Sequence, residues 1–204
     1  MMDQKQIAWG ITLLAASAGL WMLWRRRSQS NPLSLLYTKT YYPEYDMSTT
    51  ETVTHMDTSK LPRGYRNNNP LNIRISSNKW NGKVSPNTDG AYEQFIDLVH
   101  GYRAALVLLR NYIKNGYNTI EKMITRWAPE SDSNYTSNYI ANVSRLTGID
   151  KNQLISRDNK ESLCKIAYAM SISENGYKDK DENDIKETYG LPDMDIIYEA
   201  WEKI

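Results

Sequence analysis

Cysteine and histidine are scarce in this chain of 204 residues. It has one cysteine, Cys164, and two histidines, His55 and His100. A single cysteine excludes an internal disulfide, and these three side chains are too few for a typical structural zinc site or a catalytic metal triad. We therefore expect no metal and no cofactor.

Net charge and phenylalanine are also nearly absent. The formal charge of +1 indicates no electrostatic preference for nucleic acid, so no nucleic-acid partner is expected. One phenylalanine stands against 15 tyrosines and 6 tryptophans. Amphipathic rings suit surfaces that stack on polar ligands such as sugars, and they suit wet interfaces, but ordinary packing explains the same bias.

Charge is missing from residues 7–24, IAWGITLLAASAGLWMLW. As a helix, these 18 residues would span about 27 Å, which is close to the hydrocarbon thickness of a bilayer. Arg25, Arg26 and Arg27 follow at once. A cleaved signal peptide would carry its positive charge before the apolar run, so residues 1–27 are expected to be a retained transmembrane anchor. The lipid membrane is therefore a predicted partner.

The arginine triplet predicts the orientation of this anchor. Positive flanks stay on the cytoplasmic side, which places the bulk of the chain there. Residues 28–60 contain twelve Ser or Thr and two Pro, without an apolar period. This composition predicts a flexible linker between the anchor and a domain at residues 61–204.

The rest of the chain is predicted to be mainly helical. Apolar residues recur at three- and four-residue steps, with Gly116, Pro129 and Gly148 as terminators. The pattern predicts helices over 98–112, 120–127, 139–146, from about 160 to 174, and 192–201. Only residues 91–96 resemble a strand.

The domain begins with an unusual stretch, RGYRNNNPLNIR, at residues 63–74. Asn and Gly tolerate left-handed geometry, and Pro70 pushes Asn69 out of the helical region. An ordered loop or chain of turns is expected here.

A carboxylate stands where the fourth predicted helix should continue its core. Its apolar stripe is Leu163, Ile166, Ala167 and Met170, and the next position on that face is Glu174. Either the last turn frays and Glu174 faces water, or the carboxyl is half-buried near the negative end of a helix. In the second case its pKa is raised and it can act as a general acid. Cleavage of a glycosidic bond requires such an acid.

Several motifs together resemble a family of bacteriophage virion structural proteins and their prophage-encoded relatives. They occur in order over residues 61–178: RGYRNNNPLNIR, W-N-G at 80–82, HGYRAAL at 100–106, RWAPE at 126–130, NYIANV at 138–143 and SENG at 173–176. The family usually has Gly where this chain has Leu71. The resemblance implies a phage-particle protein that degrades peptidoglycan. A leucine at a position that required positive φ would imply an altered loop.

A second likeness is to lytic transglycosylases and glucosaminidases of the lysozyme superfamily. Their catalytic Glu precedes an Asn-rich loop, a W-x-G and an aromatic strand, whereas here E-N-G comes last; a circular permutation of the lysozyme-like fold would explain this. The likeness implies a loop beside Glu174 with amides for sugar hydroxyl and N-acetyl groups, rings for stacking and a cation for a peptide or lactyl carboxylate. The expected substrate-binding residues are Asn67, Asn68, Asn69, Asn72, Trp80, Tyr92 or Tyr139, and Arg74.

The number of carboxylates distinguishes two mechanisms. A hydrolase normally needs a second one, for which Glu93 and Glu130 are candidates without a compelling context. A lytic transglycosylase needs only Glu174, and this mechanism is preferred. The acidic run at 179–184 lacks the glycine and the final acid of an EF-hand loop, so a solvated turn is expected there.

The combined prediction is a single-pass membrane protein of a membrane-containing phage virion that cleaves peptidoglycan during entry or exit. The alternative is a non-enzymatic virion protein that links the membrane to capsid or spike proteins, or binds the cell wall. A host membrane-tethered autolysin is disfavoured by the predicted orientation.

Overall fold

The computed structural model describes residues 57–132 and 135–204. The predicted anchor at 1–27 and the linker up to residue 56 lie outside these ranges. The last residues of the predicted linker, Thr58–Lys60, form a 3-10 turn (η1) whose Lys60 pairs with Asp181. In the described ranges, no helix combines the length and the apolarity needed to cross a bilayer.

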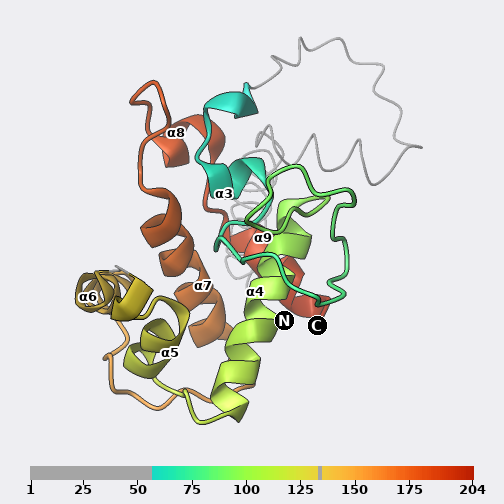
Figure 1. The fold of residues 1–204 in the computed structure, drawn as a ribbon. Helices are drawn as coiled ribbons and strands as arrows, with labels where there is room; N and C mark the ends of the chain where they lie inside the picture. The colour runs from blue at the N-terminus through green and yellow to red at the C-terminus, as the bar shows by residue number, and fades with distance from the viewer. Residues whose placement is uncertain (1–56, 133–134) are drawn as a thin grey trace, which may run out of the picture. The chain divides into compact units, whose positions relative to one another are not determined.

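The described region is mainly helical, as predicted (Figure 1). Its elements after η1 are α3 (Arg63–Arg66), α4 (Leu98–Lys114), α5 (Ile120–Trp127), η2 (Glu130–Asp132), α6 (Thr136–Thr147), α7 (Lys160–Asn175), α8 (Ile185–Tyr189) and α9 (Met194–Glu202).

Helix α7 lies at the centre and packs against α4, α6 and α9. The predicted stripe of Leu163, Ile166, Ala167 and Met170 is fully buried, which confirms the helical period. Polar caps begin the long helices: Asp97 accepts from the backbone of His100 in α4. Asn159 caps α7 in the same way, because its side chain accepts from the backbone N–H of Ser162.

Two short helices were not predicted. Helix α3 forms one turn inside the segment that was expected to be loop, directly after Pro62. Helix α8 begins at the Asp184 cap and ends at Gly190, which has φ of +69°. Both are too short for a periodic apolar pattern to indicate them.

The strand predicted at residues 91–96 forms only isolated bridges, Arg74 with Tyr92 and Lys83 with Phe95. Its pairing partner changes along its length. The N–H of Glu93 donates to the carbonyl of Ile73, whereas the N–H of Ile96 donates to that of Gly82. Because each partner segment pairs over only a few residues, no continuous ladder develops.

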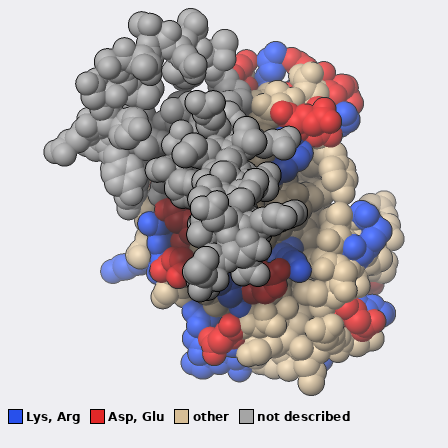
Figure 2. Space-filling view, turned by 180° about the vertical axis from the view of Figure 1, so that it is seen from behind, with Lys and Arg blue, Asp and Glu red and all other residues tan. Residues whose placement is uncertain are grey.

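The acidic run at 179–184 is only partly the solvated turn that was expected. Asp179 is 5% exposed and accepts a 2.8 Å hydrogen bond from the hydroxyl of Tyr189. It therefore anchors the turn before α8. Elsewhere, basic and acidic side chains are interspersed in small groups over the visible described surface in Figure 2, in keeping with the balanced charge.

Candidate functional site around Glu174

Glu174 lies in the last turn of α7, where the buried stripe of the helix reaches the surface. Its residue exposure is intermediate, so the side chain neither points freely into water nor is sealed in the core. Helix α7 continues through Asn175 and ends at Gly176, which has φ of +74°. Of the two alternatives that the sequence left open, the structure shows the half-buried carboxyl near a helix C-terminus.

Three side chains from three separate segments donate hydrogen bonds to this carboxylate. Oε2 accepts from the amide Nδ2 of Asn72 at 3.0 Å. Oε1 accepts from the indole Nε1 of Trp127 in α5 at 3.1 Å, and from the hydroxyl of Tyr139 in α6 at 2.9 Å. Both oxygens are thus positioned by groups whose order depends on the folded domain.

The environment raises the pKa of Glu174 above its ordinary value. Desolvation is the largest cause, and the hydrogen bonds from Asn72, Tyr139 and Trp127 act in the opposite direction. All three donors are uncharged, and no Lys or Arg of the described ranges forms an ion pair with Glu174. A carboxyl held without a counter-cation in a desolvated site is suited to proton transfer.

Tyr139, whose ring was predicted to stack on a sugar, contacts the candidate acid through its hydroxyl. Its hydroxyl faces Glu174, and its pKa is raised well above the ordinary value because it is desolvated and next to the carboxylate. The hydroxyl therefore stays protonated and remains a hydrogen-bond donor. Tyr139 positions the carboxyl and influences its pKa.

The Asn-rich loop lies beside Glu174, as expected, but only Asn72 contacts the carboxylate. Asn69 is fully buried, and its amide bonds the backbone of Ile73 and the carbonyl of Glu93. The substrate-binding prediction for Asn69 is therefore wrong, because its amide is enclosed and occupied.

Asn67 and Asn68 also hold the loop together. Asn67 is 7% exposed; it donates to Asp89 at 2.7 Å and accepts from Gln94 at 3.1 Å. Asn68 has φ of +51° and donates to the carbonyl of Phe95 at 3.0 Å. Both residues therefore have a structural role. Burial and occupied polar groups exclude the predicted sugar contact for Asn67, whereas that of the partly exposed Asn68 stays a prediction.

Asp89 is the anchor of this loop, and sequence reasoning missed it. Its carboxylate accepts from Nε and Nη2 of Arg63 at 2.7 and 2.5 Å, from Asn67, and from the backbone of Tyr92 at 3.0 Å. These contacts depress its pKa, with the Arg63 hydrogen bond as the largest cause. No sequence motif distinguished Asp89 from an ordinary turn residue.

Gly64 and Asn175 attach the loop to α7. The amide of Asn175 donates to the carbonyl of Pro70 at 2.7 Å and to that of Ser171 at 2.8 Å. A Cβ at Gly64 would lie 2.3 Å from Oδ1 of Asn175 and 3.0 Å from Oδ1 of Asn72. The absence of a side chain at residue 64 thus lets two asparagines approach next to the acid.

The leucine that replaces the family's usual glycine does not occupy a left-handed position. Leu71 is absent from the residues with positive φ, and its side chain is fully buried. The next residue, Asn72, has φ of +51°. Leu71 therefore adds core contacts, and the loop keeps a conformation in which Asn72 reaches Glu174.

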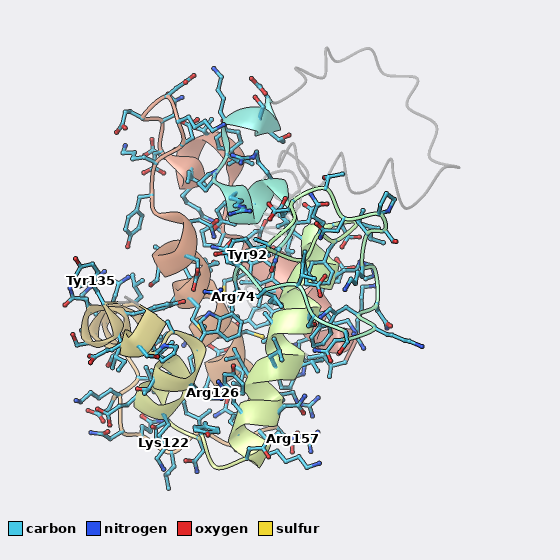
Figure 3. All side chains as sticks on the ribbon, viewed as in Figure 1. Arg74, Tyr92, Lys122, Arg126, Tyr135 and Arg157 are labelled. Carbon is cyan, nitrogen blue, oxygen red and sulfur yellow. The ribbon has the colours of Figure 1, made fainter. Side chains whose placement is uncertain are left out.

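The remaining predicted binding residues differ in their exposure. Arg74 is exposed, and the described ranges show no hydrogen bond or ion pair of its guanidinium. Tyr92 lies opposite Arg74 across the bridge, with the guanidinium of Arg63 4.5 Å from its ring centre (Figure 3). Trp80 is partly buried, and its indole N–H finds no acceptor in the described part of the chain. In the described ranges, none of the three donates a hydrogen bond to Glu174, whereas Asn72 does.

The two candidates for a second carboxylate differ sharply. Glu93 is fully buried and lies 2.9 Å from Nζ of Lys83, so it forms an internal ion pair beneath the loop. Glu130 is exposed in η2, three residues after Trp127. Burial and pairing remove Glu93 from the candidates that a substrate can reach. In the part of the chain that the structure describes, no group of three or more His, Cys, Asp or Glu side chains is placed to hold a metal ion.

Comparison with known proteins relates the chain to a bacteriophage protein. It is 41% identical over 135 residues to Protein P5 of Pseudoalteromonas phage PM2, and the match covers 64% of this chain and 82% of that protein. No protein-family model matches. The predicted relation to bacteriophage proteins is confirmed. The chain belongs to the same family as Protein P5 of phage PM2.

Proposed function

We propose that the chain is a phage virion protein whose domain cleaves the glycan strands of peptidoglycan, with Glu174 as the catalytic acid. The observation that carries this proposal is the environment of the carboxyl. Three neutral donors hold it in place, desolvation raises its pKa, and no cation of the described ranges pairs with it. These are the requirements for a group that must be protonated near neutral pH and still be oriented.

The proposed first step is protonation of the glycosidic oxygen by Glu174. As the proton moves, the bond from that oxygen to the anomeric carbon breaks, and positive charge develops on the sugar ring. The carboxylate that remains is stabilised by the N–H groups of Asn72 and Trp127 and by the hydroxyl of Tyr139. Desolvation disfavours that charge, so the donors and the burial together set the balance between acid and base.

In the second step, Glu174 accepts the proton of the sugar's own C6 hydroxyl, whose oxygen bonds to the anomeric carbon. The product is an anhydro sugar, and no water is consumed. This lytic transglycosylase mechanism is preferred because it needs only Glu174. Of the two candidates for a second carboxylate, Glu93 is paired with Lys83 and enclosed, and no hydrogen bond of the described ranges joins the exposed Glu130 to the site. Arg74 is proposed to pair with a lactyl or peptide carboxylate of the substrate.

The proposed setting is a membrane-containing virion. The chain is anchored in its membrane through residues 7–24, and the domain reaches peptidoglycan during entry or exit. This part rests on the apolar run and on the arginines that follow it. Capsid or spike proteins are further proposed partners. Retention of the full-length chain in the membrane fraction of virions after high-salt washing would support the anchor, and its release by salt alone would contradict it.

Zymography of the full-length chain on purified peptidoglycan tests the activity. Glu174→Gln should lower the cleavage rate at least about 100-fold, because general acid catalysis contributes a factor on the order of 10²–10⁴ to the rate. Glu187→Gln, at an exposed carboxyl on α8 with no proposed catalytic role, is the matched control and should retain activity. Mass spectrometry of the products should find anhydro ends. A wild-type chain that binds peptidoglycan without cleaving it would instead support the structural, wall-binding alternative.

A further inference from the structure

A path of aromatic side chains leads away from Glu174. Trp127, which donates to the carboxylate, has its ring centre 6.2 Å from that of Tyr112, at an interplanar angle of 66°. Tyr112 in turn lies 6.0 Å from Tyr117, at 61°. We call these three residues the aromatic path. It begins with Trp127 on α5, beside the candidate acid, crosses to Tyr112 near the end of α4, and continues to Tyr117 in the turn after that helix.

The rings of the aromatic path are partly exposed, unlike aromatic residues of the core. Tyr117 is 37% exposed, and Tyr112 and Trp127 have intermediate exposure. Tyr102, also on α4, is fully buried. Ordinary packing therefore explains Tyr102 but leaves part of each ring of the path open to a ligand.

Two cations accompany the path on α5. The guanidinium of Arg126 lies 5.8 Å from the ring centre of Tyr112, and Lys122 is one helical turn earlier. Both residues are exposed, and the described ranges give neither a carboxylate partner. In Figure 3, Arg126 lies between α5 and α4, below Arg74. Positive charge is therefore available beside the rings.

We propose that the aromatic path, with Arg126 and Lys122, is an extended binding site for an anionic glycan strand on one side of the bond to be cleaved. Rings with apolar faces and polar edges suit pyranose faces, and the cations suit the carboxylates that lactyl and peptide groups add to such a strand. This inference rests on the proposed function, because it assigns the substrate's further sugars to a place next to Glu174.

The proposal predicts dependence on substrate length. Tyr117→Ala in the full-length chain should raise KM for long peptidoglycan strands about fivefold to tenfold, with kcat unchanged. The shortest oligosaccharide that is cleaved should be unaffected, since it does not reach Tyr117. Arg126→Ala should raise KM for peptidoglycan and leave KM for an uncharged chitin oligomer of equal length unchanged. Tyr117→Phe should retain most of the binding.

Tyr198→Ala is a matched control. Tyr198 is a partly exposed tyrosine on α9 with Nζ of Lys160 5.0 Å from its ring centre, which resembles Arg126 and Tyr112. It bonds Glu161, 13 positions before Glu174 on α7, or about 20 Å along the helix. Equal effects of Tyr117→Ala and Tyr198→Ala, or equal effects on long and short substrates, would overturn the proposal.

A binding measurement separates this proposal from catalysis. Cosedimentation measures the affinity of the Glu174→Gln chain for insoluble peptidoglycan. This affinity should fall about fivefold to tenfold when Tyr117→Ala is added. That result supports the aromatic path even when the wild type does not cleave. Active wild type with unchanged binding and KM in Tyr117→Ala would reject the path and leave the proposed function intact. If Tyr117→Ala weakened binding to anionic lipid vesicles but left binding to peptidoglycan unchanged, the proposed glycan site would also be rejected.

Discussion

The side-chain amide of Asn72 donates a 3.0 Å hydrogen bond to the carboxylate of Glu174 across 102 positions of the chain. This contact joins the Asn-rich loop at one end of the domain to the last turn of α7. Asn72 has φ of +51°, a conformation that Asn tolerates better than most residues. The unusual loop composition thus has a physical consequence: it brings one uncharged donor to the candidate acid.

Removal of a donor should change the pH dependence of cleavage. Each hydrogen bond to Glu174 lowers its pKa, and desolvation raises it further than the three donors lower it. Tyr139→Phe removes one donor and keeps the ring, so the pKa of Glu174 should rise. Because the acid acts in its protonated form, the alkaline limb of the pH–rate profile should move to higher pH. The maximal rate should fall about tenfold as the carboxyl loses orientation.

Tyr65→Phe is the control for this profile. Tyr65 is also a buried tyrosine, but it has no contact with the carboxylate of Glu174. Its replacement should leave the alkaline limb in place. A limb that moves to lower pH in Tyr139→Phe would contradict the role assigned to Tyr139.

Gly64→Ala should disturb the site through sterics alone. Its Cβ would lie 2.3 Å from Oδ1 of Asn175, so the asparagine or the loop must shift, at about 1–3 kcal/mol of unfolding free energy. Asn72 is the other close neighbour, and its displacement should lower cleavage per folded molecule. Chemical denaturation and a rate assay on the same preparation measure the two effects.

Gly90→Ala provides the comparison. Gly90 has φ of +81° but no atom within 4 Å of a Cβ, so alanine adds backbone strain of about 1 kcal/mol without a clash. Its rate per folded molecule should stay at the wild-type level. Equal rate losses in both variants would mean that Gly64 matters only for stability.

The helices and the acid could be predicted because their signals are local. The buried stripe of α7 has the period of a helix, and Glu174 stands at its next position. Trp127 was predicted only as the last residue of the helix at 120–127, because its hydrogen bond to Glu174 depends on how α5 and α7 are placed in the fold. The roles of Asn67 and Asn69 were not predictable for the same reason, because tertiary contacts decide which groups an asparagine bonds. The partners are Asp89 for Asn67, and the carbonyls of Ile73 and Glu93 for Asn69.

Glu93→Gln distinguishes the two glycosidase mechanisms. Glu93 is buried and paired with Lys83, so the variant should be destabilised by about 1–3 kcal/mol, because the partly exposed Lys83 loses its charged partner and a buried amide replaces the carboxylate. With a single acid, cleavage per folded molecule should remain, and the products should keep anhydro ends. Loss of cleavage in a folded Glu93→Gln chain, together with reducing ends from the wild type, would identify a hydrolase.

Asp89→Asn should loosen the loop without touching the acid directly. Asp89 accepts from Arg63, Asn67 and the backbone of Tyr92, and these contacts depress its pKa below the ordinary value of 3.8. Stability from a depressed carboxyl pKa is fully present above the ordinary value and is lost as the pH falls through the lower one. The wild type should therefore lose stability below about pH 4, and Asp89→Asn should be destabilised by about 2 kcal/mol at neutral pH. The difference in unfolding free energy between the wild type and Asp89→Asn should shrink as the pH falls and Asp89 becomes protonated. Denaturation curves at several pH values measure this, and a difference that stays constant down to the lowest pH would show that the charge of Asp89 does not stabilise the loop.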